Sequence, residues 1–206
     1  MKTKFMLAIG ILSMVMMSFL SEKESFDIGD KAPLTSYDMK ATNGNMYSLE
    51  KMVKENGLLV VFSCNTCPFV VGNHKNEGWQ GRYNMLQQIC DKNKVGMVLV
   101  NSNEGKRADE DSYEAMVKHA KDQNYSSLYV MDSNSKLANG FSANTTPHVY
   151  LLDSDMTLRY TGAIDDNVKN SKEVKTFYVK DAISHLANGM KIDPTTTKNI
   201  GCSIKR

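Results

Sequence analysis

The sequence lacks an excess of charge of either sign. Its 25 lysine and arginine residues are balanced by 23 aspartate and glutamate residues, and it holds no long block of like charge, internal repeat or low-complexity segment. Proteins that bind nucleic acid usually carry a basic patch or stripe, and long-range electrostatic attraction to a charged surface needs a net charge. We therefore expect no nucleic-acid partner.

The sequence also lacks a second pair of closely spaced cysteines. It has four cysteines and four histidines. Cys64 and Cys67 form a Cys-x-x-Cys motif, whereas Cys90 and Cys202 are isolated. A structural zinc site needs a second cysteine pair or histidines at ligand spacing. The histidines are scattered along the chain, at His74, His119, His148 and His185. We therefore expect no metal site.

The N-terminus has the pattern of a secretory signal peptide, which we assign to residues 1–21. Lys2 and Lys4 precede an uncharged apolar segment, residues 5–20. The cleavage site is weak because Ser18 and Ser21 lack small residues three positions before them. An uncleaved N-terminal membrane anchor is therefore the alternative, although so short a segment is marginal for spanning a bilayer. We expect an exported protein, periplasmic in a bacterium.

The remaining chain is long enough for one domain, which we place at residues 26–192, with a C-terminal tail at 193–206. A hairpin is predicted around Asn43-Gly44, because Asn-Gly is a strong turn signal. Short apolar runs then alternate with amphipathic segments, which predicts an α/β fold with a mixed central sheet flanked by helices. The predicted strands are 58–63, 95–100, 128–131, 149–152 and 158–164, and the main helices are 111–122 and 174–190.

The Cys-x-x-Cys motif follows a buried strand directly and precedes a predicted helix. A helix N-terminus favours an anion, so we expect Cys64 there to have a lowered pKa and to be the attacking thiolate. Cys67 would resolve the mixed disulfide. The alternative is a static structural disulfide. A ring this small would restrain the unfolded chain little and would therefore add little stability. We expect a redox-active disulfide and no other cofactor.

These residues resemble a known family. The segment 62–68 together with Thr146-Pro147 resembles the thioredoxin fold, in which a cis proline faces the Cys-x-x-Cys motif. The leader 29–33 and the Asn-Gly hairpin are similar to the exported, peroxiredoxin-like AhpC/TSA redoxins, and the ending 201–205 is similar to an uncharacterised bacterial subgroup of them. The resemblance implies a thioredoxin-like fold and a thiol–disulfide oxidoreductase, with thiol- or disulfide-bearing proteins as partners.

The resemblance also assigns further site residues. Thr146 beside Pro147 would hydrogen-bond an extended substrate segment by β-addition. The buried acid that thioredoxins carry at the start of the central strand is replaced by Leu58-Leu59, so Glu104 is our candidate for the proton relay. Ser63 stands where thioredoxins usually have tryptophan before the first cysteine.

Two other activities remain as alternatives. Peroxiredoxins, which are antioxidant thiol peroxidases, place Thr or Ser three residues before the attacking cysteine, whereas Val61 and Cys64 occupy those positions here. Arg159 could supply the peroxidase arginine, but we expect it to be a surface residue. Thioredoxin-fold copper chaperones use a histidine near the thiols, and His148 is the candidate, although we expect it to have no ligand role.

The two isolated cysteines receive different predictions. Cys90 shares an apolar helix face with Trp79 and Tyr83, so we expect it in the core. Cys202 has three candidate fates: a disulfide with Cys90, an intermolecular disulfide, or a third redox thiol for the Cys64–Cys67 pair. We expect Ile200 and Ile204 to dock the tail on the domain.

Overall fold

A seven-stranded mixed sheet forms the centre of the protein, whose computed structural model describes residues 25–206. The predicted signal peptide or anchor, residues 1–21, lies outside them. The strand order is β2-β1-β5-β4-β3-β7-β8, with β3, β4 and β5 parallel and the other neighbours antiparallel. The strands are β1 (Met39–Ala41), β2 (Met46–Tyr47), β3 (Leu58–Ser63), β4 (Gly96–Asn101), β5 (Leu128–Met131), β7 (His148–Leu152) and β8 (Leu158–Gly162).

Helices cover both faces of this sheet, so every residue of β3 and β4 is buried. This explains why these strands read as apolar runs without alternation. One face packs against α3 (Tyr83–Lys92), α4 (Tyr113–Asp122) and α6 (Tyr178–Ala187). The other packs against α1 (Leu49–Met52) and α5 (Lys136–Gly140). The shorter helices are α2 (Pro68–Val71), η1 (Gln80–Arg82), η2 (Glu104–Lys106), η3 (Ser133–Ser135) and η4 (Ser171–Glu173).

The predicted N-terminal hairpin is confirmed. β1 and β2 pair around the Asn43-Gly44 turn, with Met39 opposite Tyr47, and β1 also joins the central sheet through β5. The thioredoxin-like arrangement of a mixed sheet between helices is confirmed as well. The helix predicted at 174–190 is shorter, because the backbone N–H groups of Lys175 and Thr176 donate to the Asp166 carboxylate instead of entering the helix.

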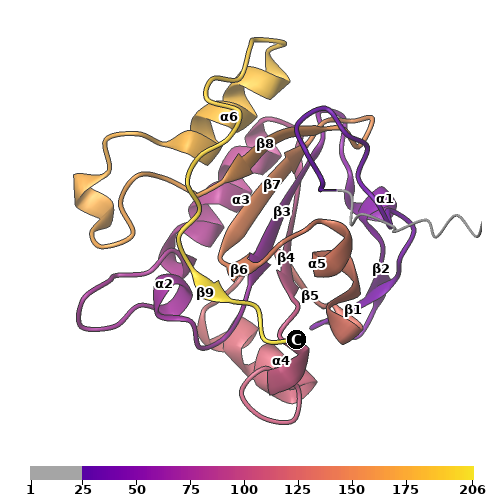
Figure 1. The fold of residues 1–206 in the computed structure, drawn as a ribbon, viewed down its shortest axis with the longest axis vertical. Helices are drawn as coiled ribbons and strands as arrows, with labels where there is room; N and C mark the ends of the chain where they lie inside the picture. Colours follow the sequence, from indigo (N-terminus) through magenta and orange to yellow (C-terminus); the bar gives the residue numbers. More distant parts are fainter. Residues whose placement is uncertain (1–24) are drawn as a thin grey trace, which may run out of the picture.

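The C-terminal tail docks on the domain as predicted. Figure 1 shows it running from α6 towards α2, passing through β9 (Cys202–Ser203) and continuing to the C-terminus. β9 pairs antiparallel with β6 (Thr145–Thr146) in a separate two-stranded sheet. Ile204 is 5% exposed and packs in the core, whereas Ile200 remains 42% exposed. The docking prediction therefore holds for Ile204 and is wrong for Ile200.

Within residues 25–206, none of the helices combines the length and the apolar character that crossing a bilayer requires.

Candidate functional site

The Cys-x-x-Cys motif and Thr146-Pro147 meet at one end of the central sheet. Cys64 follows the last residue of β3, and Pro147 directly precedes β7. Because β3 and β7 are antiparallel, the end of one lies beside the start of the other. The Thr146–Pro147 peptide bond is cis. The Cys64 sulfur lies 3.2 Å from Thr146 Oγ1, and the Cys67 thiol donates to the Thr146 carbonyl oxygen at 3.1 Å.

The structure corrects the predicted position of the helix N-terminus. Helix α2 begins at Pro68, and Cys67 is its N-cap residue. Proline is favoured at the first helical position, since its missing N–H would have no partner there, and it disfavours helical conformation in the residue before it. Cys64 therefore lies before the helix, and the helix N-terminus favours the thiolate of Cys67 instead. The prediction that Cys64 occupies the helix N-terminus is wrong.

The hydrogen bonds of the two thiols accordingly favour the thiolate at Cys67. The Cys64 thiol and then the Cys202 thiol donate to Cys67 and lower its pKa to about 5, although burial opposes this. Donation to Cys67 and burial raise the pKa of Cys64. The Thr146 carbonyl oxygen accepts from the Cys67 thiol and so favours its protonated form. This is a single acceptor, whereas several donors favour the thiolate of Cys67. The contacts of the pair therefore favour the thiolate at Cys67 over the thiolate at Cys64.

The chain's own tail fills the edge where a substrate segment was predicted to bind. Thr146 pairs with Cys202 and Thr145 with Ser203. Gly201 approaches the Thr146 carbonyl so closely that a Cβ there would lie 2.4 Å from its oxygen. The side chains of Cys64 and Cys67 are only 2% and 4% exposed. A β-strand of another protein therefore cannot pair with Thr146 while β9 is in place.

A buried carboxylate, which the sequence did not reveal, supports the loop between the cysteines. Asp111 is fully buried, and its Oδ1 accepts the backbone N–H of Asn65 at 2.9 Å. The side-chain amides of Asn101 and Asn103 also donate to it, at 2.6 and 2.9 Å. Tyr129 donates to the Asn65 side chain at 2.9 Å. The asparagines at the end of β4 and just after it are a signal in the sequence for a polar cluster. The carboxylate that accepts their hydrogen bonds, however, belongs to a separate loop.

Replacing Asp111 with asparagine is expected to destabilise the protein by about 1–3 kcal/mol. An amide at this position cannot accept the N–H groups of Asn101 and Asn103 with both of its side-chain atoms, so a buried donor loses its partner. Urea unfolding measures the change. Asp109→Asn, at an exposed position in the same loop, is the matched control and should leave the midpoint unchanged. An unchanged midpoint for Asp111→Asn would show that this network does not hold the loop.

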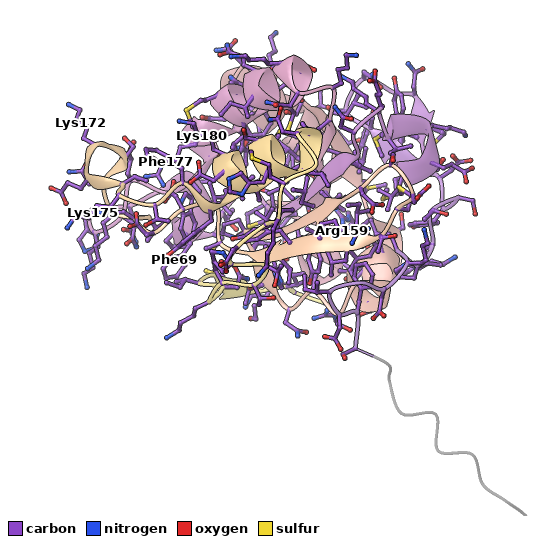
Figure 2. The ribbon with its side chains drawn as sticks, turned by 90° about the horizontal axis from the view of Figure 1, so that it is seen from above. Phe69, Arg159, Lys172, Lys175, Phe177 and Lys180 are labelled. Carbon is purple, nitrogen blue, oxygen red and sulfur yellow. The ribbon has the colours of Figure 1, made fainter. Side chains whose placement is uncertain are left out.

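Two other predicted residues, Glu104 and Arg159, lie away from the thiols. The Glu104 carboxylate accepts the backbone N–H of Asn134 at 2.9 Å and pairs with Arg107, so the structure does not bring it to either cysteine. Arg159 pairs with Asp153 at 2.7 Å and is half-exposed. Figure 2 shows Arg159 well apart from Phe69, the neighbour of Cys67.

The copper-ligand role considered for His148 is likewise not favoured. Its Nε2 lies 3.1 Å from Thr161 Oγ1, and its Nδ1 lies 3.3 Å from the Tyr150 hydroxyl. Burial lowers its pKa to about 4. Both ring nitrogens are thus engaged by β7 and β8, and no cluster of three or more potential ligands is present in residues 25–206.

The two isolated cysteines, Cys90 and Cys202, lie at opposite ends of the central sheet. Cys90 is fully buried near the start of β4, where its carbonyl accepts the Val95 N–H. Cys202 lies at the other end of the sheet, roughly 20 Å away along β3 if six residues each rise about 3.3 Å. A disulfide needs Cα atoms within about 7 Å. The predicted core position of Cys90 is confirmed, and the Cys90–Cys202 disulfide is excluded.

Solved structures with the same fold include two uncharacterised proteins. An uncharacterised conserved protein from Geobacillus kaustophilus is 30% identical, with a TM-score of 0.78 over 88% of this chain and 93% of that one. A hypothetical protein from Sinorhizobium meliloti 1021 is 26% identical, with a TM-score of 0.77 over 88% and 96%. Peroxidoxin BcpB from Mycobacterium tuberculosis shares the fold at 10% identity, with a TM-score of 0.57 over 81% and 99%.

No match to the sequence is found among the curated proteins. The family model described as Redoxin matches residues 27–178, which is more than half of the chain and includes both cysteines of the motif, Thr146 and Pro147. The fold and this match agree, and the chain belongs to the redoxin (AhpC/TSA) family of thioredoxin-like oxidoreductases.

Proposed function

We propose that the protein is a thiol–disulfide oxidoreductase whose redox pair is Cys64 and Cys67. The observation that carries this proposal is that both thiols contact Thr146 at the end of β3, the Cys64 sulfur at 3.2 Å from its Oγ1 and the Cys67 sulfur at 3.1 Å from its carbonyl oxygen. The roles are the reverse of those predicted from the sequence. Cys67 attacks and Cys64 resolves, because Cys67 is the residue whose thiolate is stabilised.

Each reaction step conserves electrons within the thiols and disulfides. The Cys67 thiolate attacks one sulfur of a substrate disulfide, and the other substrate sulfur leaves as a thiolate. Cys64 then loses its proton and attacks the Cys67 sulfur, which releases the second substrate thiolate and closes the Cys64–Cys67 disulfide. The substrate gains two electrons and the pair loses two. The thiolate consumed at Cys67 is also the largest cause of the raised pKa of Cys64, so the first step makes the second easier.

The partners follow from this chemistry. They are molecules that carry thiols or disulfides, and an exported protein would meet disulfide-bonded proteins in an oxidising compartment. No other cofactor is needed, because the two cysteines hold the electron pair themselves.

Peroxide reduction at Cys67 is the second candidate, and the enclosure of the site favours it. A small oxidant can approach a thiolate that is 4% exposed more easily than a protein disulfide can. The thiolate would attack the peroxide and become a sulfenic acid, with release of water or an alcohol. Condensation with the Cys64 thiol would then form the disulfide and a second water. Against this candidate, the hydroxyl of Thr146 contacts Cys64 rather than Cys67.

Comparison of the two rates decides between the candidates. We expect the reduced protein to reduce a model protein disulfide faster than it consumes hydrogen peroxide at equal concentrations. Rapid consumption of peroxide that needs no protein disulfide and is lost in Cys67→Ser would show that the protein is a peroxidase. Absence of both reactions in protein that forms no Cys64–Cys67 disulfide would overturn the proposed function.

The ionisation of Cys67 gives a separate prediction. Thiolate absorbance in the ultraviolet, measured against pH on the reduced protein, should show one cysteine ionising near pH 5, because donation from Cys64 and Cys202 lowers its pKa. This step should vanish in Cys67→Ser and remain in Cys64→Ala at a higher pH, since an alanine side chain cannot donate to the Cys67 thiolate. Cys90, whose pKa burial raises to about 12, should not contribute. A step near pH 5 that survives Cys67→Ser would assign the thiolate to Cys64.

A further inference from the structure

A third thiol, that of Cys202, lies in the same site. In an antiparallel pair, residues opposite each other project to the same side of the sheet. Cys202 is opposite Thr146, whose hydroxyl lies 3.2 Å from the Cys64 sulfur. The Cys202 side chain therefore projects towards the redox pair and packs against the apolar cluster that contains Cys64 and Cys67.

The strand that carries Cys202 is anchored on both sides. The N–H of Ile204 donates to the Asn144 carbonyl at 2.9 Å, and the Ile204 side chain is buried. The next residue, Lys205, donates to Asn103 at 2.9 Å and accepts from Gly105 at 2.8 Å. The close approach of Gly201 to the Thr146 carbonyl fixes the other side. The position of Cys202 beside Cys67 is therefore built into the fold.

The three thiols also differ in their access to solvent. Cys64 and Cys67 are almost fully buried, whereas Cys202 is half-buried. β9 occupies the edge at which an extended protein segment would have to pair. An external protein thiol can therefore meet the sulfur of Cys202 more easily than that of either cysteine in the pair.

We propose that Cys202 is a relay cysteine that carries disulfide exchange between the enclosed Cys64–Cys67 pair and external protein thiols. This inference rests on the proposed function of that pair. In the oxidised protein, the Cys202 thiolate attacks the Cys67 sulfur, so a Cys67–Cys202 disulfide forms and Cys64 leaves as a thiolate that takes up a proton. No electrons are gained or lost in this step, because one disulfide replaces another.

The second half of the relay regenerates the reduced protein. One thiolate of an external dithiol attacks the Cys202 sulfur, and Cys67 leaves. A thiol of low pKa is the better leaving group, and the hydrogen bonds that stabilise the Cys67 thiolate make it one. The second external thiol then releases Cys202. The external dithiol loses two electrons, and the three cysteines of the site end as thiols.

Disulfide mapping tests whether the relay bond exists. Full-length Cys64→Ser protein, oxidised with diamide, should contain a Cys67–Cys202 disulfide as its main intramolecular bond. The matched control combines Cys64→Ser with Cys202→Ser and Ser203→Cys, which moves the thiol by one residue to the opposite side of β9. This control should form no bond to Cys67. Failure of the bond in Cys64→Ser would overturn the inference, and so would equal bond formation in the shifted control.

Kinetics test whether the bond lies on the reaction path. Reduction of the oxidised protein by a reduced dithiol protein such as thioredoxin should be slowed at least about tenfold by Cys202→Ser, while reduction by the small thiol dithiothreitol should change less. Ser203→Ala, on the same strand, should match the unsubstituted protein in both. An equal rate for Cys202→Ser would overturn the relay but leave the proposed function intact. Oxidised protein that contains no bond to Cys64 or Cys67 would contradict the proposed function itself.

Discussion

Replacing Cys67 with serine is expected to lower the rate of protein disulfide reduction by at least about 10³-fold, the order of loss that follows removal of a catalytic nucleophile. The hydroxyl of serine has no accessible anionic form, and neither remaining thiol of the site is activated. Losing the Cys67 thiolate removes the largest cause of the raised pKa of Cys64, but burial still disfavours its thiolate, and burial raises the pKa of Cys202 to about 11. The initial rate of reduction of a model protein disulfide at neutral pH measures the loss.

The partner variant should behave differently. Cys64→Ser keeps the attacking residue and loses the resolving one, so a mixed disulfide should form through Cys67. Cys202 can resolve this intermediate, so we expect stable trapping only in Cys64→Ser combined with Cys202→Ser. Mass spectrometry of the trapped protein identifies the cysteine involved. Trapping through Cys64 in a Cys67→Ser protein would reverse the assignment and restore the roles predicted from the sequence.

The sequence predicts the scaffold of this site well because the scaffold depends on local patterns. An apolar run ending in Cys64 specifies a buried strand, and Asn43-Gly44 specifies a hairpin turn. The helix start was misplaced by three residues, although Pro68 marks it, since proline favours the first helical position. That displacement places the helix N-terminus at Cys67 instead of at Cys64.

The other missing parts of the site depend on contacts between distant segments. Two residues of β9 are too few to form a recognisable strand pattern, and they form a strand only because Thr145-Thr146 lies beside them. Asp111 looks like an ordinary residue before a helix, and only the fold buries it beneath Asn65. No local hydrophobic periodicity or sequence motif predicts that the C-terminal tail docks on the redox pair, or that Asp111 supports the loop between the two cysteines.

A buried ion pair joins the segment after β8 to the elements that follow Cys67. Arg82 and Asp165 have side chains that are 6% and 4% exposed, and Arg82 Nη1 lies 2.7 Å from both carboxylate oxygens. Trp79 Nε1 donates to the same carboxylate at 2.9 Å. The backbone N–H of Trp79 in turn donates to the Phe69 carbonyl in α2 at 3.0 Å. Asp165 therefore braces the helix whose N-cap residue is Cys67.

Asp165→Ala is expected to destabilise the protein by about 3–5 kcal/mol, because it leaves the buried guanidinium of Arg82 without its main counter-charge. The remaining acid, Glu77, is 3.8 Å away and half-exposed. Urea unfolding measures the loss, and Glu55→Ala, which breaks a solvent-exposed pair with Lys94, is the control that should change stability little. Arg82→Met combined with Asp165→Leu removes both charges and should recover most of the loss, since apolar groups of similar size can replace a buried pair. An exposed ion pair contributes less than about 1 kcal/mol. A loss of that size for Asp165→Ala would mean that the Arg82 side chain rotates into solvent and that Asp165 is not needed to hold α2 in place.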